Sequence, residues 1–135
     1  MIVLPVTLQG IQHHEHTSID FLNVDSKGRI DLNQLEVLLK SSNKDTMVSL
    51  MQVNNEIGTC IDLQSIGNLC KQYGALFHSD TVQGVGFSKY DLKNTPVDFI
   101  SGSAHKFYAP KGSGFVYINH QQKIEPFIHG GSQER

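Results

Sequence analysis

The sequence predicts an α/β fold, built as a three-layer α/β/α sandwich around a mostly parallel sheet. Three observations support this class. Apolar, β-prone runs alternate with segments of helical periodicity, the connecting loops are short, and three successive predicted strands end in clusters of polar residues. Repeated strand–helix–strand units form parallel sheets, in which ligands bind beyond the carboxyl ends of the strands.

The N-terminal part of the chain predicts two short strands. Residues 1–8 are apolar and β-prone, although Pro5 restricts them to an edge or an irregular start. Residues 21–24 form a second short apolar run. A turn is expected at 25–28, where Gly28 supplies a positive φ.

Two helices are predicted from capping residues and apolar periodicity. Asp31 is expected to cap the first, with Gln34 completing a capping box, and this helix ends near Lys40. Asp62 is expected to cap the second, which Gly74 stops. Their apolar faces consist of Leu32, Leu35, Leu38 and Leu39 in the first helix and of Leu63, Ile66, Leu69, Cys70 and Tyr73 in the second.

Further apolar runs predict strands at 46–53, 75–78, 97–101 and 115–118. The polar clusters that follow the first three contain Asn55 and Glu56, then Asp80 and Gln83, then Ser103, His105 and Lys106. One such cluster has a simple explanation, because strand ends are commonly polar. Three clusters at the same edge of a sheet, with a carboxylate and a lysine among them, instead indicate a ligand site.

Composition excludes several classes of function. The 135 residues fit one domain, and a hydrophobic content of 39% allows a core. A net charge of −2 without a basic run makes nucleic acid an unexpected partner. No apolar run approaches the roughly 20 residues of a membrane span, so we expect no membrane association. Cys60 and Cys70 form neither a CxxC pair nor a zinc pattern, which favours free thiols and a cytoplasmic protein.

A histidine-rich segment, residues 12–18, raises the question of a metal site. His14 and His16 alternate instead of standing four residues apart on a helix, and no further set of ligands is evident. We therefore predict a solvated polar loop here and no metal.

The stretch 99–114 is the chemical centre of the sequence. An apolar strand leads to Lys106 among hydroxyls and glycines. A lysine at a strand end can form a Schiff base with a carbonyl compound, and pyridoxal 5′-phosphate (PLP) is the commonest such partner. The alternative, from this stretch alone, is a surface turn with a solvated lysine.

Four motifs in order along the chain resemble the cysteine desulfurases of the class V aminotransferase family, which are fold type I PLP enzymes. The motifs are NNEIGT (54–59), FHSDTVQGVG (77–86), SGSAHKFYAPKGSG (101–114) and HGGSQER (129–135). The separation of Asp80 and Lys106 also matches the family pattern. The resemblance implies that residues 21–135 are part of the large domain of a PLP-dependent transferase, and that residues 1–20 match it poorly.

The resemblance also implies roles for individual residues. Lys106 would be the Schiff-base lysine and would move the Cα proton of the substrate. Asp80 would pair with the pyridinium nitrogen and keep the ring able to accept electrons. Gln83 would donate a hydrogen bond to the 3′ oxygen of the cofactor.

Further positions complete the implied site. Ser103 and His105 would bind the phosphate, and Asn55 would contact the substrate carboxylate or the 3′ oxygen. For Asn55, Gln83 and Ser103 taken singly, the alternative is a buried polar residue that satisfies backbone groups. His16, within Glu15-His16, resembles the histidine that stacks on the cofactor ring and helps proton transfer. The chain between His16 and Phe21 is shorter than in the family, so this segment is either internally deleted or not homologous.

The function implied for the whole enzyme is conversion of L-cysteine to L-alanine, with sulfur carried as a persulfide. The sulfur would pass to a scaffold for iron–sulfur clusters or to tRNA thiolation, and the enzyme would be a homodimer. Family chains are much longer, and neither Cys60 nor Cys70 stands where their catalytic cysteine does, so we interpret this chain as a fragment of the large domain. The alternatives are a non-catalytic remnant, or another class V enzyme such as a selenocysteine lyase or an aminotransferase.

Overall fold

The computed structural model describes residues 17–43 and 45–125. In chain order its elements are α2 (Leu32–Ser41), β1 (Met47–Met51), α3 (Leu63–Gln72), β2 (Leu76–Asp80), β3 (Phe99–Ser103), the 3-10 helix η1 (Ala104–Phe107) and β4 (Gly114–Ile118). None of the helices in the described residues is both long enough and apolar enough to cross a membrane.

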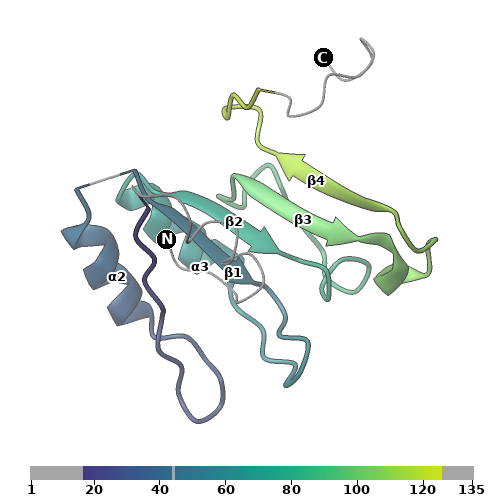
Figure 1. The fold of residues 1–135 in the computed structure, drawn as a ribbon, viewed down its shortest axis with the longest axis horizontal. Helices are drawn as coiled ribbons and strands as arrows, with labels where there is room; N and C mark the ends of the chain where they lie inside the picture. The colour runs from purple at the N-terminus through teal and green to yellow at the C-terminus, as the bar shows by residue number, and fades with distance from the viewer. Residues whose placement is uncertain (1–16, 44, 126–135) are drawn as a thin grey trace.

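The four strands form one sheet in the order β1-β2-β3-β4, so that each strand lies beside the strand that precedes it in the sequence (Figure 1). β1, β2 and β3 are parallel, and β4 turns back to pair with β3 in the antiparallel direction. The α/β class and the mostly parallel sheet predicted from the sequence are confirmed.

One face of this sheet packs on the helices. Val48, Leu50 and Phe77 alternate with half-exposed residues along β1 and β2, as a strand with one buried face requires. Helix α3 packs on β2, and α2 packs beside α3, so the described helices lie in one layer. Each large side chain fully buried here, such as Phe77, stabilises the fold by about 1.5–3 kcal/mol.

Both helices begin and end close to where the sequence predicted. The Asp31 carboxylate accepts hydrogen bonds from the backbone N–H groups of Asn33 and Gln34, and Asp62 accepts one from Gln64. Gly74, which follows the C-cap residue Tyr73 of α3, adopts φ +69°, the left-handed conformation that ends a helix at low cost in glycine. Local capping chemistry therefore sets these boundaries.

Two local predictions were wrong, and Gln34 explains both. Its side chain does not close a capping box, because Oε1 accepts from the Asn23 N–H at 2.6 Å and Nε2 donates to the Phe21 carbonyl at 3.3 Å. Backbone groups of residues 21–24 are therefore hydrogen-bonded to the Gln34 side chain instead of to a neighbouring strand. They form a single antiparallel bridge, Val24 to Ile30, in place of a strand. The strand predicted at 1–8 lies outside the described residues.

Candidate active site at the carboxyl edge of the sheet

The carboxyl ends of the parallel strands bring the predicted site residues to one edge. Asp80 is the last residue of β2 and Ser103 the last residue of β3, and Asp80 lies directly opposite Ser101 in the register. η1 starts immediately after β3 and carries His105 and Lys106. β2 and β3 each extend two residues beyond the predicted ends, which makes Asp80 and Ser103 strand residues and fixes their backbones.

Ser103 and His105 contact each other directly. The Ser103 hydroxyl lies 2.7 Å from Nδ1 of His105. Ser103 stands at the N-cap position of η1 but makes no side-chain capping bond there, so its hydroxyl is directed toward the imidazole instead. A hydroxyl and an imidazole fixed side by side can present a donor to an anion, because their mutual bond uses only one of their hydrogens.

Lys106 is exposed on η1, and within residues 17–43 and 45–125 its amine takes part in no ion pair. Tyr108 ends η1 in the left-handed conformation with φ +67°, a strained conformation for an aromatic residue, and its N–H donates to the Ala104 carbonyl. The turn that holds Lys106 is thus sharply defined by its backbone, while the amine stays accessible.

The turn after β2 is held against β3 and η1. Asp80 Oδ1 accepts from the Val82 N–H at 2.9 Å, and Gln83 follows half-buried in the same turn. Gly86 lies so close to η1 that an added Cβ would stand 2.6 Å from the Cβ of Phe107. This close approach brings the segment that carries Gln83 next to the helix that carries Lys106.

Thr81 is a supporting residue that the sequence reasoning missed. It is fully buried, and both its backbone N–H and its hydroxyl donate to the Ser101 carbonyl at 2.9 Å. These bonds join the end of β2 to β3 next to Asp80. A threonine in the polar cluster that follows a predicted strand gives no signal that distinguishes this role from a surface turn.

A second group that was missed crosses the sheet on the face opposite the core. The Ser49 hydroxyl lies 2.7 Å from Nδ1 of His78, and Nε2 of His78 lies 3.2 Å from the Ser101 hydroxyl. Burial lowers the pKa of His78 below its ordinary value, and the negative charge of Asp80 opposes this effect. The available signal was one polar residue in each of three predicted strands: Ser49 inside 46–53, and His78 and Ser101 as the last residues of 75–78 and 97–101.

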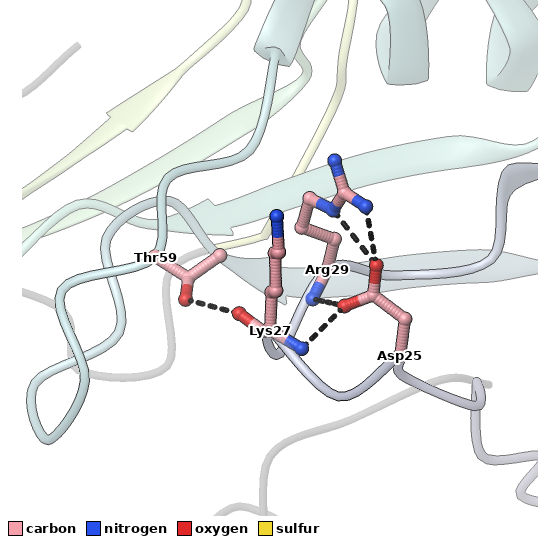
Figure 2. A network of polar contacts seen from close by, with 4 residues as sticks. All are labelled: Asp25, Lys27, Arg29 and Thr59. Atoms are coloured by element: carbon pink, nitrogen blue, oxygen red, sulfur yellow. Dashed lines mark hydrogen bonds and ion pairs between the residues drawn. The ribbon is translucent and has the colours of Figure 1, made fainter.

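Asn55 lies at the exposed tip of the turn after β1. The preceding residue, Asn54, shapes this turn, because its Oδ1 accepts from the backbone N–H groups of Glu56 and Ile57 at 2.9 and 3.0 Å. The Thr59 hydroxyl donates to the Lys27 carbonyl at 3.1 Å, which joins the Asn55 turn to a second turn at 25–29 (Figure 2).

That second turn is itself closed by Asp25. Figure 2 shows its carboxylate between the backbone N–H groups of Lys27 and Arg29 and the Arg29 guanidinium, which lies 2.7 Å away. The Arg29 backbone N–H and guanidinium hold the pKa of Asp25 below its ordinary value. Gly28, at φ +73°, allows the two turns to pack, because a Cβ there would lie 2.3 Å from Cδ1 of Ile57.

The remaining sequence predictions concern the histidine-rich segment, a metal site and the two cysteines. His16 and the rest of the histidine-rich segment up to residue 16 lie outside the described residues. Among residues 17–43 and 45–125, no group of three or more His, Cys, Asp or Glu side chains is placed to hold a metal ion. Cys60 is exposed, whereas Cys70 is in the core, where burial raises the pKa of its thiol to about 12.

Comparison with known proteins gives one consistent result. The family model described as aminotransferase class V matches residues 5–135. The chain is 40% identical over 136 residues to the protein named cysteine desulfurase IscS from Clostridium botulinum, a match that covers 93% of this chain and 34% of the relative.

Solved structures of similar proteins also superpose on this chain. A NifS-like protein from Rickettsia africae superposes with a TM-score of 0.79 at 36% identity, over 93% of this chain and 35% of the other. A structure described as SspA in complex with cysteine gives a TM-score of 0.83 at 29% identity, over 96% and 37% of the two chains. This chain therefore spans about a third of the length of the relatives it matches.

Proposed function

The chain belongs to the aminotransferase class V family, and we propose that residues 21–135 are part of the PLP-binding large domain of a cysteine desulfurase. The boundary near residue 20 is part of this proposal. Similarity to the Clostridium botulinum cysteine desulfurase supports the activity, and the residues at the carboxyl edge of the sheet support the cofactor.

One observation carries the proposal: Asp80 at the end of β2 stands beside the strand that ends in Ser103 and leads to His105 and Lys106. These side chains fit the chemical groups of PLP. The Ser103 hydroxyl and the His105 imidazole are donors for a phosphate, and a lysine amine suits the carbonyl carbon. A carboxylate suits the ring nitrogen, because it favours the protonated ring.

When bound, PLP would supply an electron sink for the carbanion formed at the substrate Cα. Lys106 Nζ would take the proton from Cα and return it later in the reaction. The Asp80 carboxylate would accept a hydrogen bond from the protonated ring nitrogen. Gln83 would donate to the 3′ oxygen, and Asn55 would contact either that oxygen or the substrate carboxylate. His16 would stack on the ring.

We propose L-cysteine as the substrate and L-alanine as the product. The name of the Clostridium botulinum relative supports this assignment, and so does the cysteine in the description of the SspA structure. In the whole enzyme a cysteine thiolate would attack the substrate sulfur and hold it as an enzyme persulfide. The sulfur would then pass to an acceptor, a scaffold protein for iron–sulfur clusters or tRNA thiolation, and the whole enzyme would be a homodimer. Cys70 is unsuited to carry the sulfur, because it is buried and its pKa of about 12 keeps it protonated. Two free thiols favour the cytoplasm as the compartment.

PLP binding by the purified 135-residue chain tests the proposal. We expect the absorbance band of lysine-bound PLP, and after borohydride reduction a pyridoxyl group on Lys106 in the mass spectrum. Lys106→Ala should abolish both signals, whereas Lys111→Ala, at an exposed lysine in the next turn, should keep them. A chain that never acquires the band, or acquires it equally with Lys106→Ala, would exclude this cofactor site.

A further inference from the structure

His78 has an unusual environment for a residue with no assigned role. It occupies the middle of β2 on the face opposite the core, and its ring lies between hydroxyls from both neighbouring strands. Ser49 is its direct partner in the β1 register, and Ser101 projects from β3. The imidazole thereby joins three strands through side chains alone.

The hydrogen bonds and the burial of His78 favour a neutral ring. A neutral imidazole has one donor and one acceptor nitrogen, and serine hydroxyls can serve as the partner of either. Burial lowers the pKa of His78 below its ordinary value of 6.5, so the uncharged form predominates near neutral pH. The described groups that face it from β1 and β3 are hydroxyls without charge, and the charge that acts on it is Asp80 on its own strand.

Asp80 follows His78 by two residues, so both side chains project from the same face of β2, about 7 Å apart along the strand. Asp80 is also paired with Ser101, the residue whose hydroxyl contacts His78. The ring is therefore attached to both strands that flank β2, two residue pairs before Asp80 along the β1–β2 register.

We propose that His78 is a positioning residue for Asp80, a neutral imidazole that holds the centres of β1, β2 and β3 together two residues before Asp80 and leaves the Asp80 carboxylate for the PLP ring nitrogen. A cation at this position would compete with the pyridinium for the same carboxylate. An apolar residue would make none of these side-chain bonds between the three strands on this face. The inference rests on the proposed PLP function, but the coupling between His78 and Asp80 belongs to the chain itself.

The first test uses the chain without cofactor. The titration of His78 is followed by NMR in the wild type, in Asp80→Asn and in Asp45→Asn, which removes the same charge from an exposed position before β1. We expect Asp80→Asn to lower the pKa of His78 further, because the charge that raises it is lost, and Asp45→Asn to leave it unchanged. Equal values in the wild type and Asp80→Asn would overturn the proposal, whether or not the chain binds PLP.

The second test uses the PLP-bound chain and ¹⁵N-labelled cofactor. Glutamine is neutral and can keep one donor and one acceptor bond. The Kd of His78→Gln for PLP should therefore stay within about twofold of the wild-type value, with the PLP ring nitrogen protonated. His78→Leu should raise the Kd roughly tenfold and shift the ¹⁵N resonance toward the unprotonated ring.

Ser49→Ala and Ser101→Ala each remove one hydrogen bond of His78, so their Kd and ¹⁵N values should lie between those of the wild type and His78→Leu. These two variants test the positioning role if His78→Leu fails to fold. Equal Kd and ¹⁵N values in all these variants would overturn the positioning role. A wild-type chain without PLP affinity would instead contradict the proposed function, and the cofactor-free titration would still decide whether His78 and Asp80 are coupled.

Discussion

The Ser103 hydroxyl lies 2.7 Å from Nδ1 of His105, so the last residue of β3 orients the imidazole that follows it. We predict that Ser103→Ala and His105→Ala each weaken PLP binding roughly tenfold, the size expected for a lost hydrogen bond to a charged group. The double variant should lose less binding free energy than the two single variants lose together, because each side chain holds the other in place. PLP titration measures all three, with Ser113→Ala as an exposed control. Strictly additive losses would contradict the pairing.

The two cysteines should differ sharply in reactivity. Cys60 is exposed, whereas Cys70 is buried with its pKa raised to about 12. A thiol reagent at pH 8 should modify one cysteine in the folded chain and both in denaturant, because thiolates are the reactive form. Mass spectrometry of the labelled peptides identifies the site. Rapid labelling of Cys70 in the folded chain would show that α3 is not packed as described.

Gly67 and Gly74 form a matched pair for testing packing. A Cβ at Gly67, inside α3, would lie 2.0 Å from the Pro96 carbonyl, whereas a Cβ at Gly74 meets no atom within 4 Å. Gly67→Ala should therefore destabilise the fold by about 2–3 kcal/mol despite the better helix propensity of alanine. Gly74→Ala should cost about 1 kcal/mol from its positive φ alone. Chemical denaturation compares them, and the reverse order would contradict the contact of α3 with Pro96.

Thr59→Val removes the hydroxyl that joins the Asn55 turn to the turn at 25–29 while keeping the shape of the side chain. The free energy of unfolding should fall by about 0.5–1.5 kcal/mol, the usual contribution of one hydrogen bond. Amide exchange at Gly58, whose N–H donates to the Asn54 carbonyl, should become faster. Ser26→Ala, at an exposed position of the other turn, is the control. The same exchange rate in both variants would show that the two turns are independent.

The buried imidazole of His78 should make stability depend on pH. Its pKa is lower in the folded chain than its ordinary value of 6.5, so the unfolded chain binds more protons between these two values. Stability should therefore fall as the pH drops from about 7 through this window, and then level off below the folded-state pKa. His78→Gln should remove this part of the dependence, whereas His120→Gln, at an exposed position, should retain it. Parallel stability curves for the wild type and His78→Gln would exclude the effect.

Features encoded by neighbouring residues were predictable from the sequence. The caps at Asp31 and Asp62 and the stop at Gly74 depend on atoms within one helical turn, and each lies where local chemistry indicated. The edge that gathers Asp80 and Lys106 was predictable as well, because parallel strands end together.

Features that depend on register or on distant partners were not predictable. The Gln34 side chain bonds to the backbone of residues 21–23 and not to the N-terminus of α2. This depends on where the preceding chain runs, which the residues around Gln34 do not indicate. His78 contacts Ser49 because the two residues are paired in the register of β1 and β2. No local sequence pattern indicates this register. The roles of the individual site residues remain predictions.

Because the spatial order of the four described strands is the order in which they occur along the chain, this part of the sheet can grow by addition at one edge. β2 needs only β1 as a template, β3 needs only β2, and the short turn to β4 closes last. During synthesis the chain emerges in this same order, so β1 and β2 can pair before β3 leaves the ribosome. The cofactor edge would then be assembled in sequence as the chain leaves the ribosome, without the rearrangement of earlier pairings that an interleaved strand order demands.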